Sequence, residues 1–259
     1  MTPPEIIVEQ QGGILWITMN RPERLNALSE DIVSGIAGAM EQADRDDEVK
    51  GAVISGAGRA FSAGGDVRSM QDARPEIVED YVGRLNRAIL AIKNLPKPVV
   101  AQVHGFCAGA GFNLALACDL VVAAEDAQFM MSFVQVGLIS DGGGLYFLPR
   151  LVGVHRAKEL LFLGDPISAG RAYDLGLVNR VVAADDLQKE TTALMDRLAH
   201  GPGLAIGQMK RMVDNSWDAS LEQMLRAEQT EQPHLVASWD HKEGVRAFLE
   251  KRRPRFEGR

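Results

Sequence analysis

Short apolar runs alternate with amphipathic segments along the first two thirds of the chain. Residues 6–8 and 14–19 are β-branched runs on either side of a Gln-Gly-Gly turn, which predicts a hairpin. Ser29 precedes a segment with helical apolar spacing, so we expect a capped helix over residues 30–44. The run GAVISGAG at residues 51–58 then predicts a buried strand closed by a glycine turn.

The same alternation continues to residue 163. Residues 80–95 have helical spacing and end before two prolines, and VVAQVHG at residues 99–105 is another apolar strand. A helix, two strands and two helices are expected next, at residues 113–117, 120–123, 127–129, 142–151 and 155–163. This order indicates an α/β fold with a mainly parallel sheet covered by helices, and with ligands near the carboxyl ends of the strands.

The chain changes character after residue 200. Segments 204–214, 221–230 and 241–251 have helical spacing and are rich in Met, Arg and Glu. We therefore expect a core over residues 1–200, which binds the ligand, and a C-terminal helical region over residues 201–259. The apolar stripes of this region are typical of core or subunit contacts.

Composition indicates a soluble protein of a reducing cytoplasm. Hydrophobic residues make up 46% of the chain and charged residues 24%, and no apolar run approaches the ~20 residues of a membrane span. The first residues lack the pattern of a signal peptide, and two cysteines cannot form a disulfide framework. The net charge of −7 argues against general nucleic-acid binding.

Two glycine-rich bends follow apolar runs: FSAGGD at residues 61–66 and GFCAGAG at residues 105–111. Small residues let main-chain N–H groups come close to a ligand, and two such donors converging on one carbonyl oxygen form an oxyanion hole. Either bend alone is more typical of an ordinary tight turn. The pair predicts a site that stabilises negative charge on a carbonyl oxygen.

The spacing of residues argues against other common nucleotide-binding, catalytic and metal-binding motifs. GAGFNL is not a complete GxGxxG motif, and the sequence contains no Walker A motif and no GxSxG elbow. The five histidines are scattered and no cysteine pair has ligand spacing, so we expect no metal. Cys107 lies in the second bend without a base nearby in sequence, which is typical of a small buried residue.

Five sequence blocks, in order, resemble the enoyl-CoA hydratase/isomerase, or crotonase, superfamily. They are NRPERLNAL, AFSAGGDV, KPVVAQVHGFCAGAGFNLALACDLVVAAEDAQF, GLISDGGGLYFLPRLVG and GDPISAGRAYDLGLVNRVV, and the resemblance covers nearly the whole chain. It implies a spiral of repeated ββα units with a C-terminal helical region, usually assembled as trimers or hexamers. It also implies an acyl-CoA substrate, so coenzyme A arrives as part of the thioester and no separate cofactor is expected.

Carried over to this sequence, the resemblance implies that the main-chain N–H groups of Gly65 and Ala110 are the oxyanion donors. Removing a proton beside a thioester carbonyl leaves an enolate, and fixed donors stabilise the charge on its oxygen. The second position is often glycine in the family. Alanine keeps the N–H, so the difference is harmless unless the position requires a positive φ.

The hydratases of this superfamily hold water between two glutamates, and this chain has Asn113 and Phe133 at those positions. Neither side chain is a base near neutral pH. Phe133 either lines an apolar acyl pocket or is an ordinary packing residue, whereas Asn113 either orients a substrate or water or is a neutral filler.

Asp141, in GLISDGGG, occupies a position that is acidic in several isomerases of the superfamily, including ring-opening epoxide and enoyl- or dienoyl-CoA isomerases. One carboxylate suits isomerisation because the same group can take a proton from one carbon and return it to another. On composition alone Asp141 is typical of an N-cap or turn. A helix N-terminus would lower its pKa and apolar neighbours would raise it, and the sequence leaves that balance open.

The resemblance also places the ligand's phosphates near Arg21 and Arg24 and its adenine near Ala63 and Asp66. The basic residues 251–253 offer a second patch, either for a ligand of a neighbouring subunit or as a solvated face.

From the single acid we expect an isomerase that shifts a double bond, or opens a ring epoxide, in an acyl-CoA. The first alternative is a hydratase or related lyase in which Asp141 activates water. The second is an acyl-CoA-binding protein that has kept the oxyanion hole and lost catalysis.

Overall fold

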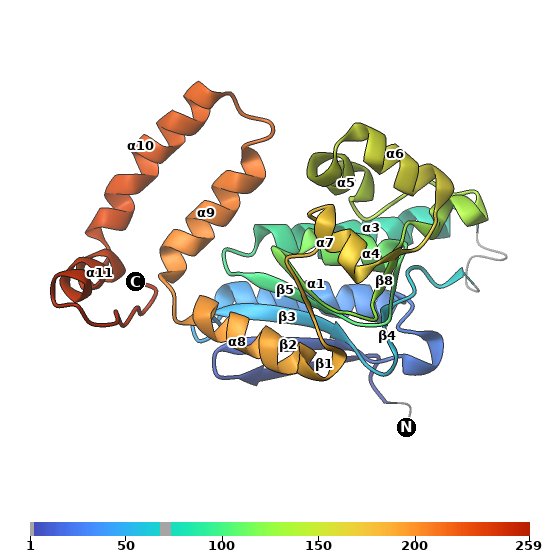
Figure 1. Ribbon diagram of the computed structural model, residues 1–259, viewed down its shortest axis with the longest axis horizontal. Helices are drawn as coiled ribbons and strands as arrows, with labels where there is room; N and C mark the ends of the chain where they lie inside the picture. Colours follow the sequence, from blue (N-terminus) through green and yellow to red (C-terminus); the bar gives the residue numbers. More distant parts are fainter. Residues whose placement is uncertain (1–2, 68–73) are drawn as a thin grey trace.

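The computed structural model describes residues 3–67 and 74–259, and these residues form two sheets covered by helices (Figure 1). The larger sheet has six strands, in the order β1 (Ile6–Gln11), β2 (Ile14–Met19), β3 (Gly51–Gly56), β5 (Val99–Val103), β7 (Leu120–Ala124) and β10 (Arg180–Val182). β1 and β2 form the predicted antiparallel hairpin, and the remaining neighbours pair in parallel.

The smaller sheet has four short strands, in the order β4 (Ala60–Ser62), β6 (Phe106–Ala108), β8 (Gln128–Met130) and β9 (Ile167–Ser168). The chain passes from β3 to β4, from β5 to β6 and from β7 to β8, so each of these three strands of the large sheet is followed by one of the small sheet. β6 lies inside the predicted bend at residues 105–111, and β4 overlaps the start of the predicted bend at residues 61–66.

The helices of the core are α1 (Glu30–Arg45), α3 (Pro75–Asn94), α4 (Ala110–Ala117), α5 (Gly144–Val152), α6 (Val154–Leu163), α7 (Ala169–Asp174) and α8 (Leu187–Ala199), with 3₁₀ turns η1 (Pro22–Arg24), η2 (Ser132–Val136) and η3 (Ala184–Asp186). Ser29 caps α1 as predicted, because its side chain accepts a hydrogen bond from the Ile32 N–H. α3 and α4 begin earlier than predicted, at Pro75 and Ala110.

The core lies between the large sheet and the helices. β5 and α4 are buried along their whole length, so α4 has no polar face from which helical periodicity could be read. α1 is amphipathic and buries Ile32, Val33, Ile36 and Met40 against the sheet side of the core. This arrangement places the N-terminus of α4 at the carboxyl end of β6, where the second glycine bend lies.

Beyond residue 200 the chain forms α9 (Gly203–Asn215), α10 (Leu221–Ala237) and α11 (Trp239–Leu249), which project away from the sheets (Figure 1). The side chain of Lys210 joins α9 to the core, because its Nζ lies 2.9 Å from Asp119 Oδ2 and donates to the Ile92 carbonyl at 2.8 Å. No residue of α10 is buried. Within residues 3–67 and 74–259, no helix is long and apolar enough to cross a membrane.

Candidate active site

The first glycine bend leaves the end of β4 and is held by the neighbouring segment 25–28. The Leu28 N–H donates to the Gly64 carbonyl at 2.7 Å, and the Ala63 N–H donates to the Leu25 carbonyl at 2.9 Å. Leu28 and Gly65 form an isolated parallel bridge. The main chain around Gly65 is therefore fixed by hydrogen bonds from a second strand-like segment.

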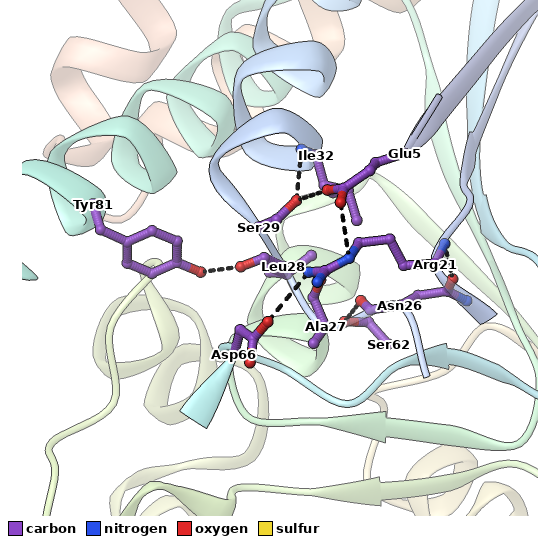
Figure 2. A network of polar contacts seen from close by, with 10 residues as sticks. All are labelled: Glu5, Arg21, Asn26, Ala27, Leu28, Ser29, Ile32, Ser62, Asp66 and Tyr81. Atoms are coloured by element: carbon purple, nitrogen blue, oxygen red, sulfur yellow. Dashed lines mark hydrogen bonds and ion pairs between the residues drawn. The ribbon is translucent and has the colours of Figure 1, made fainter. Parts of the chain in front are cut away.

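The 25–28 segment is itself held by side chains. Leu25 and Asn26 both have left-handed φ angles, of 51° and 55°, and the Asn26 Nδ2 donates to the carbonyls of Ala57 and Ala60, each at 2.8 Å. Three successive carbonyls of the segment each accept a side-chain hydrogen bond, as Figure 2 shows: Asn26 from Ser62 Oγ at 2.8 Å, Ala27 from Arg21 Nη1 at 3.2 Å, and Leu28 from Tyr81 Oη at 2.9 Å.

The second bend touches the first. Gly64 has a φ of +92°, and a Cβ placed on it would lie 2.7 Å from the Ala108 oxygen and 3.2 Å from the Ala110 nitrogen. A Cβ on Gly111 would lie 2.6 Å from the Ser62 Cβ. The small residues of both bends are thus required by close contact, and they bring the Ala110 amide next to Gly64.

Alanine at position 110 fits the local backbone. Ala110 is the first residue of α4, and the positive φ needed to enter this helix falls on Gly109, at 51°. Among the described non-glycine residues, positive φ angles occur at Leu25, Asn26 and Lys251. The main-chain conformation at position 110 therefore permits alanine, as expected.

The N–H groups of Gly65 and Ala110 are available for a ligand. Within the described chain neither group donates a hydrogen bond to another residue. Ala110 is also at the N-terminus of α4, where the helix leaves its first amides without internal acceptors and carries partial positive charge.

Asp141 is joined to the second bend through Asn113. The Asn113 Nδ2 donates to Ser140 Oγ at 2.9 Å and to the Asp141 carbonyl at 2.7 Å, and the Gly144 N–H donates to the same carbonyl at 3.2 Å. Asn113 is three residues after Ala110, so its Cα lies about 4.5 Å further along the axis of α4. The backbone of the acid is therefore anchored one turn from the second N–H donor.

One oxygen of the Asp141 carboxyl group is left without a partner among the described residues. This oxygen, Oδ1, is buried. α5 begins after Gly143 with no side-chain cap, so the carboxyl group does not serve as an N-cap. Burial raises the pKa of Asp141 to about 6, outweighing the opposite effect of a hydrogen bond from its own backbone.

Asn113 and Phe133 have different surroundings. The Asn113 side chain is fully buried and its Oδ1 has no partner among the described residues. A Cβ on Gly144 would collide with this oxygen, so position 144 requires glycine. Phe133 is half-buried, and its ring edge lies 3.9 Å from the place of a Cβ on Gly109, beside the second bend.

The predicted coenzyme A residues lie around the 25–28 segment. Arg24 is exposed at the end of η1, next to Leu25, which binds Ala63. Asp66 lies 3.3 Å from Arg21 Nη1, and Arg21 also meets Glu5 at 3.1 Å (Figure 2). Arg21 thus pairs with two carboxylates and holds the first bend, a structural role that the sequence did not suggest.

Two further contributors had no readable signal in the sequence. Asn26 lies within NRPERLNAL, but only the structure shows that its amide joins Ala57, just after β3, to Ala60 at the start of β4. Tyr81 is one position on α3 that faces the site, and no motif marks it. Cys107 is buried as predicted, and burial raises the pKa of its thiol. Among the described residues no three His, Cys, Asp or Glu side chains cluster as metal ligands.

Comparison with known proteins identifies the class. Residues 9–259 match the family model described as "Enoyl-CoA hydratase/isomerase", so the chain belongs to this family. It is 36% identical to the 1,2-epoxyphenylacetyl-CoA isomerase of Escherichia coli over 98% of each chain, and 33% identical to the crotonyl-CoA hydratase of Syntrophomonas wolfei over 99% of each.

The same fold occurs in a solved structure of Geobacillus kaustophilus, titled as enoyl-CoA hydratase subunit I, with a TM-score of 0.92, 40% identity and 98% of each chain covered. The predicted crotonase-type fold with a helical C-terminal region is thereby confirmed. Relatives named as isomerases and as hydratases are similarly distant, so the choice between the two reactions depends on the site.

Proposed function

We propose that the protein is an acyl-CoA isomerase that moves a double bond, or opens a ring epoxide, in an acyl-CoA thioester. Asp141 carries the proton, and the N–H groups of Gly65 and Ala110 bind the thioester oxygen. The observation that carries this proposal is the partly buried Asp141 carboxyl, whose Oδ1 has no hydrogen-bond partner among the described residues and whose pKa is raised to about 6. A base with a pKa near the working pH is well suited to both taking and returning a proton.

The surroundings of Asp141 favour isomerisation over hydration. Hydration needs a water molecule held and split, for which the family uses two glutamates. At those two positions stand the buried amide of Asn113, which is bonded to the backbone of Asp141, and the ring of Phe133. Neither residue can share the proton transfer with Asp141.

The proposed reaction conserves every atom of the substrate. For a 3-enoyl-CoA, the Asp141 carboxylate removes a proton from C2, and the electron pair moves into the thioester to give a dienolate. Two preset N–H donors stabilise the charge on its oxygen. Asp141 then returns the proton to C4, the C2=C3 double bond forms, and the C=O bond is restored.

Isotope labelling tests the proposal. The enzyme is incubated in deuterated water with 3-enoyl-, 2-enoyl- and epoxyacyl-CoA esters, and label position and product mass are read by mass spectrometry. We expect label at the ends of a shifted double bond with no added water. Gain of one water on a 2-enoyl-CoA would show a hydratase, and tight binding with no exchange at C2 would show a binding protein without catalysis.

We also propose that the chain assembles as a trimer or hexamer through its C-terminal helices. Large apolar side chains on these helices and their connection are exposed in the single chain: Met209, Val213, Trp217, Leu221, Leu225, Phe248 and Leu249. An exposed apolar surface of this kind is typical of subunit contacts. Light scattering coupled to size-exclusion chromatography gives the mass directly, and a monomer at micromolar concentration would contradict assembly.

A further inference from the structure

Helix α3 contacts both the segment that holds the first glycine bend and the segment that contains Asp141. Near its start, the Tyr81 hydroxyl donates to the Leu28 carbonyl at 2.9 Å (Figure 2). One turn further, the fully buried Leu85 lies against the segment of the acid, because a Cβ on Gly142 would be 3.2 Å from Leu85 Cδ2. The helix therefore bridges the first glycine bend and the neighbour of Asp141.

Leu28 is the residue through which Tyr81 reaches the bend. Its side chain is fully buried, its N–H donates to the Gly64 carbonyl at 2.7 Å, and it is in bridge register with Gly65. The other two side-chain bonds to the segment, from Ser62 and Arg21, end two residues and one residue earlier, on Asn26 and Ala27 respectively. Among these three donors, Tyr81 is the one that holds the carbonyl of Leu28, the residue in bridge register with Gly65. Arg21 holds the Ala27 carbonyl, which belongs to the peptide unit whose N–H donates to Gly64.

We propose that Tyr81 is a positioning residue for the reaction: its hydroxyl, acting through Leu28, fixes the direction of the Gly65 N–H toward the thioester oxygen. This inference rests on the proposed function, because it takes the Gly65 and Ala110 amides as the oxyanion donors. An oxyanion donor is effective only if its direction is set before reaction, which is what a bond to the adjoining strand segment supplies.

The electrostatics of Tyr81 support a permanent donor. Burial, with the nearby charges of Asp141 and Asp66, raises the pKa of the Tyr81 hydroxyl well above its ordinary value. The phenol therefore keeps its proton throughout the working pH range. Its bond to Leu28 does not depend on whether Asp141 holds a proton.

The polarisation of a bound thioester carbonyl tests this inference without requiring turnover. A saturated acyl-CoA labelled with ¹³C at the thioester carbonyl is bound to the enzyme, and its NMR shift is compared with that of the free ester. We expect a downfield shift in the wild type and loss of about half of it in Tyr81→Phe, since one of two donors is misdirected. The kcat of Tyr81→Phe should fall about tenfold with KM within twofold.

A matched control is Tyr173→Phe, which removes a hydroxyl from a tyrosine on α7 that is 54% exposed, and should leave the carbonyl shift and kcat at wild-type values. A Tyr81→Phe protein with a lower melting temperature but the wild-type carbonyl shift would make the residue merely structural and overturn the proposal. If the wild type itself shows no carbonyl shift, the oxyanion hole and the proposed function fail together.

A second replacement keeps the test decisive if Tyr81→Phe does not fold. Replacing the Tyr81 side chain by 4-aminophenylalanine keeps the ring and weakens the donor instead of removing it. A carbonyl shift between those of the free ester and the wild type supports the proposal. The full wild-type shift contradicts it.

Discussion

The two halves of the candidate site treat their polar groups in opposite ways. Around the first bend, three successive carbonyls, the Asn26 amide and the Arg21 guanidinium all have partners. In the other half, Asp141 Oδ1 and Asn113 Oδ1 are buried without any partner in the described chain. The first half bonds the groups that support the Gly65 N–H, and the second leaves an oxygen of its proposed base unsatisfied.

The difference follows from what each half has to do. An N–H donor must point in one direction before charge develops, so its backbone benefits from every available bond. A base must bind a proton well enough to take it from carbon, and a hydrogen bond or cation at its oxygens would lower that affinity. The same fold therefore stabilises one half and leaves buried polar oxygens without partners in the other, which costs stability.

The largest effect is expected from removing the acid. Asp141→Asn keeps the size of the side chain but cannot accept a proton, so kcat for double-bond migration should fall by about 10²–10⁴-fold. Binding of the acyl-CoA, measured by calorimetry, should change little. Asp126→Asn, at an exposed turn, is the matched control and should keep full turnover; equal loss in both variants would remove the special role of Asp141.

A single added methyl group should disrupt the contact between the two glycine bends. In Gly64→Ala the new Cβ would lie 2.7 Å from the Ala108 oxygen, at a φ of +92° that alanine rarely adopts, so the two bends must separate. We expect a loss of about 10²–10³-fold in kcat, the usual effect of losing one oxyanion donor. Turnover within twofold of the wild type would show that the contact between the bends is not needed.

The buried carboxyl group of Asp141 should affect the free energy of unfolding in a pH-dependent way. The folded pKa of Asp141 is about 6 against an ordinary value of 3.8, so the fold favours the protonated acid and loses that advantage as the pH rises through 6. At pH 8, Asp141→Asn should therefore be more stable than the wild type by about 3 kcal/mol, with no difference below pH 3.8.

Urea unfolding of both proteins at pH 8 and at pH 3.5 measures this difference. A variant that is less stable than the wild type at pH 8 would mean that the Asp141 carboxylate makes a favourable contact in the folded protein. The comparison between the two halves of the site would then be wrong.

The smallest effect is expected from Gly38→Ala, which controls for the replacement of a glycine as such. Gly38 is exposed on α1, and a Cβ there would meet nothing within 4 Å. Gly38→Ala should stabilise the protein by about 0.5–1 kcal/mol in urea unfolding and leave kcat unchanged. A loss of activity in this variant would show that Gly64→Ala reports a general response to replaced glycine.

The sequence predicted much of this fold because its periodic elements are long. The hairpin, the Ser29 cap, the buried β5 and the family blocks were all visible as patterns. β4 and β6 were missed because strands of three residues that end in glycine bends carry no periodicity. The start of α4 was placed too late because a helix buried on all sides lacks an amphipathic face.

The candidate site was predictable in its parts but not in its connections. The bends and Asp141 follow from glycine patterns and from family resemblance, and these residue roles remain predictions. Whether burial or the helix N-terminus would control the pKa of Asp141 depends on packing, which the structure decides in favour of burial. The contacts of Tyr81, Arg21 and Asn26 join segments 31 to 53 residues apart, and the pattern of a single sequence carries no signal of such pairing.

The pH dependence of kcat/KM for double-bond migration tests most directly whether the desolvated carboxylate of Asp141 is the base. Because the carboxylate is the reactive form, kcat/KM should rise tenfold per pH unit up to a pH of about 6 and then level off. A profile that is already level at pH 4.5, or that shows no acid limb, would contradict the account.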